Sequence, residues 1–188
     1  MCEYALDSDT AAEEASAGTQ EARKKTREAL SEEERTTLDE ELYKMAGSPA
    51  LTEEDMEPFK DSPRIMEDLM KRDPASQVKA LLDKGADPNG HKYDLTGACA
   101  LRNAAEHGNT PVLPLLLEAG ALIDATDDDG DTALHSAAFE GKEDAVRVLL
   151  EAGADFKLKN ADGGTPKFGA SVMGNQSIVD LIEAHEAK

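Results

Sequence analysis

The chain has 188 residues with 40 acidic and 20 basic side chains, which gives a formal net charge of −20. Such a charge excludes sequence-independent nucleic-acid binding, because that binding needs Lys and Arg side chains to displace the counterions of phosphate groups. It disfavours anionic membrane surfaces as well, and no apolar stretch approaches the roughly 20 residues of a membrane-spanning helix. Aromatic residues make up 4% of the chain and Trp is absent, so we expect a thin core of Ala, Leu and Val without a deep ligand cavity.

The start of the chain and its cysteines bear on location. Residues 1–18 contain neither the basic nor the apolar region of a secretory signal peptide. Cys2 and Cys99 have neither the spacing of a metal knuckle nor the number needed for a disulfide framework. We therefore expect a soluble protein of the cytoplasm or the nucleus, with no bound metal and no cofactor.

Residues 1–60 are expected to form an acidic, partly disordered arm, because they hold half of the net charge and almost no branched aliphatic residues. A helix is predicted near residues 31–45, where a capping box opens at Ser31. Three large apolar residues then share one face of this helix: Leu38, Leu42 and Met45. The arm is interpreted as a solubilising segment or, alternatively, as a docking motif.

An internal repeat of 33 residues organises the rest of the chain. The first signal is a glycine that recurs at Gly108, Gly141 and Gly174. Four other signals recur with the same spacing: Leu116-Leu117 and Leu149-Leu150, Gly120-Ala121 and Gly153-Ala154, Gly130 and Gly163, and Thr132 and Thr165. Because one period explains five separate signals, the chain is predicted to be an array of repeated units.

The unit that begins at Asp127 contains Thr132-Ala133-Leu134-His135-x-Ala137 and closely resembles the ankyrin repeat, whose signature is T-P-L-H-x-A on a 33-residue period. The resemblance covers about residues 64–186. It implies an all-α solenoid of helix-turn-helix units with β-turn fingers. In this family Thr132 would begin the first helix and His135 would follow one turn on, so that their side chains lock the turn. His135 is therefore interpreted as structural and not catalytic.

The resemblance implies four units, at about residues 61–90, 91–123, 124–156 and 157–188. The first and last are expected to be caps, because the end units of a solenoid need a polar outer face. In the last unit Lys167 and Glu183 stand where Leu134 and Leu150 stand one unit earlier, which puts charge on that face.

The first unit departs further from the pattern, since it lacks a turn finger. Four bulky residues fall at its first-helix positions: Ile65, Met66, Leu69 and Met70. These side chains would leave an apolar end on the array. We hypothesise that the helix near residues 31–45 folds back and covers this end; in the alternative, the four residues pack only within their own unit.

In the second unit Cys99 and Arg102 stand where Thr and His are usual. The hydrogen bonds that lock the turn should therefore be weaker there, and Cys99 is expected to be a small buried filler. The finger loop before it is two residues longer than in the next unit and contains Tyr93. We expect this loop to project beyond its neighbours.

Two motifs resemble sites for small ligands but lack residues that such sites require. An EF-hand with Gly130 at its sixth position would have Ala125 first and Ser136 last, where an acid and a bidentate Glu are required. The sequence from Gly164 to Ser171 resembles a phosphate-binding loop, but Ala170 replaces its Lys. We predict no calcium site, no nucleotide site and no catalytic residues, and hence no enzyme.

Ankyrin arrays bind other proteins through a concave surface of finger tips and first helices, and the resemblance carries these contact positions onto this chain. The predicted partner-binding residues are Tyr93, Leu95, Thr96, Glu106, His107, Asp128, Asp129, Asp131, Phe139, Glu140, Asp162 and Met173. They combine an acidic strip with a few apolar anchors, of which Phe139 is the strongest candidate. The alternative for Phe139 is packing against its own repeat.

These residues predict a protein-interaction module, an adaptor or scaffold that binds a partner with a basic surface and an apolar centre, since charge steers encounters and aromatic side chains supply binding energy. Two other functions remain open: a chaperone or targeting factor that escorts client proteins, and a small enzyme inhibitor of the ankyrin type. We expect a monomer that binds neither nucleic acid nor membranes.

Overall fold

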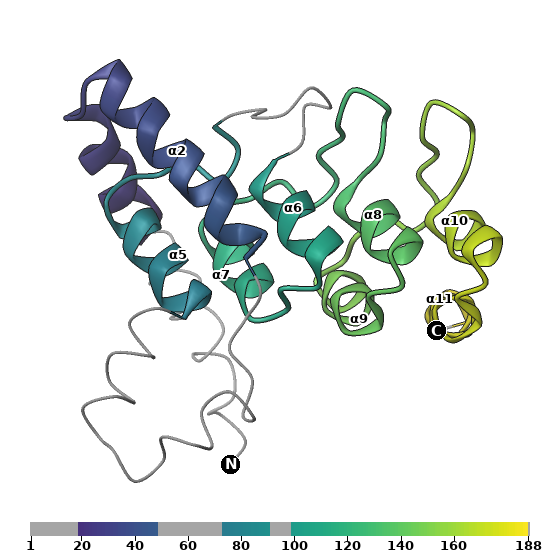
Figure 1. Ribbon diagram of the computed structural model, residues 1–188. Coiled ribbons are helices and arrows are strands. Elements are labelled where there is room, and N and C mark those ends of the chain that lie inside the picture. Colours follow the sequence, from purple (N-terminus) through teal and green to yellow (C-terminus); the bar gives the residue numbers. More distant parts are fainter. Residues whose placement is uncertain (1–18, 49–72, 91–98, 188) are drawn as a thin grey trace, which may run out of the picture.

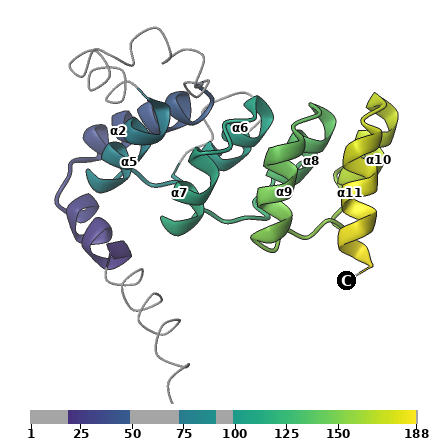
Figure 2. The ribbon, with the colours of Figure 1, turned by 90° about the horizontal axis from the view of Figure 1, so that it is seen from below.

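The computed structural model describes residues 19–48, 73–90 and 99–187 of the chain. Within these ranges all regular elements are helices, which form a row of stacked helix pairs (Figures 1 and 2). A first helical segment spans residues 19–28. The others are α2 (Glu32–Ala46), α5 (Pro74–Asp83), α6 (Ala100–His107), α7 (Val112–Glu118), α8 (Ala133–Phe139), α9 (Glu143–Glu151), α10 (Pro166–Met173) and α11 (Gln176–Glu186).

Two layers of helices make up the row. The first helices of the units, α6, α8 and α10, form one layer, and the second helices, α7, α9 and α11, form the other (Figure 1). The loops before α8 and α10 extend beyond the first helices as fingers (Figure 1). This arrangement is the all-α solenoid of helix-turn-helix units that the repeat predicts.

The turn before α8 is locked as the sequence predicts. Oγ1 of Thr132 accepts a hydrogen bond from the backbone N–H of His135 (3.4 Å), and the N–H of Thr132 donates to Nδ1 of His135 (3.3 Å). At the other end of this helix Gly141 has a φ of 72°, a left-handed conformation that a residue without Cβ adopts at little energetic expense. Cys99 is the N-cap residue of helix α6 and makes no side-chain hydrogen bond to it, and Cys99 is partly buried against the core.

The core is thin and consists of small and aliphatic side chains. Alanines at the close contacts between first helices are fully buried, among them Ala104, Ala105, Ala137 and Ala138. Leucines fill the space between successive units, and Leu101, Leu116, Leu134 and Leu149 are buried. Because alanine lets two helix backbones approach closely, the units pack tightly, and no Phe or Tyr ring is buried within the part of the chain that the structure describes.

The charged outer face predicted for the last unit is present. The ammonium group of Lys167 on α10 lies 3.6 Å from a carboxylate oxygen of Glu183 and 3.3 Å from one of Glu186 on α11. On the inner side of α11, Ile178 and Ile182 are buried against the preceding unit. The last helix pair therefore has an apolar side toward the stack and a charged side away from it.

Helix α2 takes the place of a first helix at the other end of the row. The amide of Asn109 donates to the carbonyl oxygen of Ala46 (3.0 Å), as the amide of Asn175 donates to that of Ala138 two units further along (3.0 Å). In the same way, Asn103 reaches the carbonyl oxygen of Tyr43 (2.7 Å). These bonds set α2 beside α6, and α2 also packs against α5 (Figures 1 and 2).

The apolar face of α2 packs into the array, as the fold-back hypothesis expects. Leu42 is fully buried, and Leu38 and Met45 are partly buried against the core. The helix contacts both α5 and α6. The four residues whose repeat positions predict the first helix lie outside the described residues: Ile65, Met66, Leu69 and Met70.

A partly buried ion pair connects the segment of residues 19–28 to the array. The guanidinium of Arg27 donates to both carboxylate oxygens of Asp39 on α2, at 2.7 Å each, and to the carbonyl oxygen of Gly85 (3.1 Å). The Asp39 carboxylate also accepts a hydrogen bond from the backbone N–H of Asp87 (2.8 Å). Asp39 thus joins three separate stretches of the chain.

Candidate functional site

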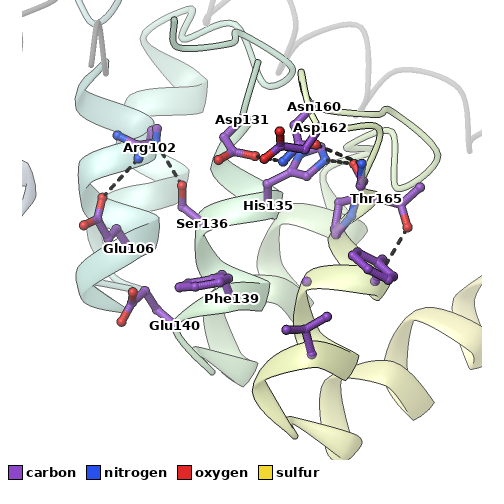
Figure 3. A pocket seen from close by; sticks show the side chains of 15 residues that line it. Arg102, Glu106, Asp131, His135, Ser136, Phe139, Glu140, Asn160, Asp162 and Thr165 are labelled. Atoms are coloured by element: carbon purple, nitrogen blue, oxygen red, sulfur yellow. Dashed lines mark hydrogen bonds and ion pairs between the residues drawn. The ribbon is translucent and has the colours of Figure 1, made fainter. Parts of the chain in front are cut away.

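An open groove lies between α8 and α10 on the side of the first helices, with a cavity of about 360 Å³ (Figure 3). We call it the α8–α10 groove. Side chains from α6, α8 and α10 line it together with residues of the finger before α10. They include Arg102, Glu106, Asp131, His135, Ser136, Phe139, Glu140, Asn160, Asp162, Phe168, Gly169 and Val172.

Large apolar side chains are exposed in this groove. Phe139 at the end of α8 is 47% exposed, and Phe168 and Val172 on α10 are 62% and 64% exposed. Met173, also exposed, follows on the same helix. Since contiguous exposed apolar side chains mark interaction sites more often than single ones do, the groove is the candidate binding site.

The rim of the groove is acidic. Glu106, Asp131, Glu140 and Asp162 line it (Figure 3). The one Arg or Lys among the lining residues is Arg102, whose Nη2 lies 3.7 Å from a carboxylate oxygen of Glu106. A segment that enters this groove therefore meets an apolar centre and negative charge around it.

Arg102 links two units of the array. Its Nε donates to Oγ of Ser136 (2.9 Å) and lies 3.2 Å from a carboxylate oxygen of the buried Asp127. Arg102 occupies the repeat position that His135 occupies in the following unit. The ring of His135 likewise reaches across to the unit after its own. Both side chains thus connect a first helix to the finger or helix that follows it.

His135 is held within the array. Its Nδ1 accepts from the backbone of Thr132, and its Nε2 lies 3.2 Å from the carbonyl oxygen of Gly164 in the next finger. The side chain is buried. Both ring nitrogens have partners inside the chain, in agreement with the structural role inferred for this residue.

Five of the residues predicted to bind a partner line the α8–α10 groove: Glu106, Asp131, Phe139, Glu140 and Asp162. Four others lie outside it. His107 contacts the carbonyl oxygen of Asn103 through Nδ1 (3.0 Å), Asp128 and Asp129 are exposed at the finger before α8, and Met173 is exposed on α10. Tyr93, Leu95 and Thr96 lie outside the described residues, together with the other residues of the range 91–98 in the long finger loop.

Phe168 and Arg102 line the groove but are not among the residues that the sequence predicts to bind a partner. Phe168 stands 33 residues after His135, so the repeat alignment places an aromatic ring where a turn-locking histidine is expected. The signal in the sequence that could identify Phe168 is this large apolar side chain at a normally polar position of the repeat. Arg102 stands at the same repeat position one unit before His135. It departs from the usual histidine, but the sequence predicts no contact for it.

Residues 19–48, 73–90 and 99–187 contain no group of three or more His, Cys, Asp or Glu side chains placed to hold a metal ion. In the same ranges, no helix has the length and apolar character needed to cross a membrane.

The fold and the groove define a class of protein, the α-helical solenoids that present a recognition face on one layer of helices. A model of ankyrin repeats in three copies matches residues 67–160, which is half of the chain, and the protein belongs to the ankyrin repeat family. Ankyrin repeats are protein-interaction modules, so the chain carries such a module. The comparison with curated proteins found no match.

Proposed function

We propose that this protein is an adaptor or scaffold that binds a partner protein through the α8–α10 groove. The observation that carries the proposal is the gathering of Phe139, Phe168 and Val172, all about half exposed or more, in one groove. Exposed aromatic side chains of this kind supply much of the binding energy of interfaces when a partner buries them.

The partner we propose has a basic surface around an apolar centre. Four carboxylates line the groove, and the one guanidinium that lines it already contacts acidic side chains. Asp128 and Asp129 add exposed negative charge at the neighbouring finger. Complementary charge accelerates encounter and suppresses wrong partners, so Lys and Arg side chains of a partner would face this rim.

We further propose that the protein acts as a monomeric binding module of the cytoplasm or nucleus and not as an enzyme. The groove offers no nucleophile next to a general base, because His135 is bonded on both ring nitrogens inside the array. The carboxylates that line the groove lie on an open surface, from which water is not excluded.

The test begins with proximity labelling by the full chain to identify a partner, followed by calorimetric titration of that partner into purified variants. The combination of Phe139→Ala and Asp162→Lys should weaken binding roughly tenfold or more. The matched control is Glu151→Lys, which changes the charge equally at an exposed site of α9.

An affinity that Phe139→Ala with Asp162→Lys leaves unchanged would remove the groove as the binding site. A chain that binds no native partner and instead suppresses the aggregation of unrelated unfolded proteins would favour the chaperone function. Weakening by the double variant at low salt but not at high salt would assign the effect to charge alone.

A further inference from the structure

One position of the repeat explains why the array has an open groove between α8 and α10. The fourth residue of each first helix is Asn103 in α6, Ser136 in α8 and Gly169 in α10, spaced 33 residues apart. The side chain at this position points toward the first helix of the preceding unit.

In the two earlier units this side chain fills the space between neighbouring first helices. Asn103 is buried and donates to the carbonyl oxygen of Tyr43 on α2 (2.7 Å). It is packed so tightly that a Cβ added to Gly47 would lie 2.5 Å from its amide nitrogen. Ser136 is buried as well, and its hydroxyl accepts from Arg102 on α6 (2.9 Å).

Gly169 leaves the corresponding space between α8 and α10 unfilled. A Cβ added to Gly169 would meet one heavy atom within 4 Å, Cδ2 of Phe139 at 4.0 Å, which is an ordinary van der Waals contact. This space is part of the 360 Å³ groove, and Phe139, Phe168 and Gly169 are among the residues that line it. The volume of the groove is within the range of about 300–1,000 Å³ found for ligand pockets.

The backbone of α10 does not require this glycine. Gly169 lies in the middle of a helix and is not among the glycines with positive φ. Glycine within a helix destabilises it relative to alanine, and the added Cβ would fit. Neither conformation nor packing inside the chain accounts for Gly169, whereas close approach of a ligand is a recognised reason for a glycine.

We propose that Gly169 keeps open a slot between Phe139 and Phe168 that receives one large apolar side chain of a partner segment, with Lys or Arg residues flanking that side chain. The apolar walls select the inserted side chain, and the acidic rim of Glu106, Glu140 and Asp162 selects its neighbours. This inference rests on the proposed function and names the partner segment that the groove recognises.

The experiment measures binding of three fluorescein-labelled peptides to the full chain by anisotropy. Each peptide has four Lys or Arg residues on either side of a central Ser-X-Ser, with X as Leu, Ala or Asp. The wild-type chain should bind the Leu peptide roughly tenfold more tightly than the Ala peptide, and the Asp peptide most weakly.

Filling the slot should remove this preference and leave the charge-driven binding in place. Gly169→Leu should bring the affinity for the Leu peptide down to that for the Ala peptide, and Gly169→Ala should reduce the preference while raising the melting temperature. Ser171→Leu is the matched control, since it introduces the same leucine side chain at an exposed position of α10 outside the groove. It should keep the preference.

Each other outcome counts against one or both proposals. Equal affinities for the Leu and Ala peptides, or a preference that survives in Gly169→Leu, would overturn the slot. If the variant with Phe139→Ala and Asp162→Lys then still binds the peptides more weakly than the wild-type chain does, the groove remains the binding face. A chain that binds none of the three peptides would contradict the slot and the proposed basic partner together.

Discussion

The side-chain amide of Asn109 donates a hydrogen bond to the carbonyl oxygen of Ala46, at 3.0 Å, across a sequence separation of 63 residues. The amide of Asn175 makes the same bond to Ala138 at 3.0 Å, across 37 residues. The two bonds are equivalent in the array, because Asn109 and Asn175 each follow the glycine that ends a first helix. Ala46 thus occupies the position that Ala138 occupies in its own unit, although Ala46 belongs to the segment predicted to be an acidic arm.

We therefore propose that α2 extends the repeat array on the N-terminal side of the units that the 33-residue repeat defines. The repeat register of the sequence assigns Met66 and Met70 to the places that Leu42 and Ala46 take beside α6. The family match from residue 67 onward begins after α2.

Leu42→Ala should destabilise the whole array. The side chain is fully buried among α2, α5 and α6, and truncation of such a leucine costs about 2–5 kcal/mol. Urea unfolding followed by circular dichroism measures the change. The control is Leu122→Ala, which removes an exposed side chain and should change stability by less than about 0.5 kcal/mol. Equal effects of the two variants would contradict the place assigned to α2.

The two partners of the Arg27–Asp39 ion pair should respond unequally to substitution. The side chain of Asp39 is 2% exposed and that of Arg27 is 24% exposed. Arg27→Met leaves a buried carboxylate without its cation, which costs about 3–5 kcal/mol. Asp39→Asn keeps an acceptor for the N–H of Asp87 and leaves a guanidinium that can turn toward water, so its effect should be smaller.

A double-mutant cycle checks this asymmetry. The variant with both Arg27→Met and Asp39→Asn should be less destabilised than the sum of the single variants, because the second substitution removes the charge that the first one strands. Additive effects would show that the two side chains do not interact in solution.

The capping box of α2 should make this helix sensitive to acid. Hydrogen bonds from the backbone and then the hydroxyl of Ser31 lower the pKa of Glu34 below its ordinary value of 4.5. A depressed carboxyl pKa contributes stability above the pKa of the unfolded chain, and this contribution is lost as the pH falls through the folded value. Side-chain NMR titration should show the pKa of Glu34 rise in Ser31→Ala, and an unchanged pKa would argue against the capping box.

Lys167→Leu should make the last unit associate with other copies. Lys167 pairs with Glu183 and Glu186 on the outer face of α10 and α11, and the residues that the structure describes include no further unit beyond α11. Leucine there would recreate the apolar surface that Leu134 buries against the next unit. Sedimentation velocity should reveal concentration-dependent association for Lys167→Leu and none for Lys159→Leu, which loses the same charge at an exposed site.

Most of the fold could be predicted, because the repeat is a local pattern. Thr132 and His135 are three residues apart and lock their turn through contacts within one unit. Lys167 and Glu183 replace leucines of the preceding unit, and that substitution was enough to predict a charged outer face. A helix opened by Ser31 with Leu42 on its apolar face was also predictable, since capping and periodicity depend on near neighbours in the chain.

The place of α2 and the shape of the groove came from contacts that no local pattern encodes. The bonds of Asn103 and Asn109 to α2 join residues about 60 positions apart, outside the 33-residue period. The open space beside Gly169 exists because Phe139 and Phe168 from adjacent units face it while no side chain fills it. The amino-acid pattern thus determines the helix pairs from α6 to α11 and the −20 charge, whereas packing between units decides where α2 lies and where the surface of the array stays open.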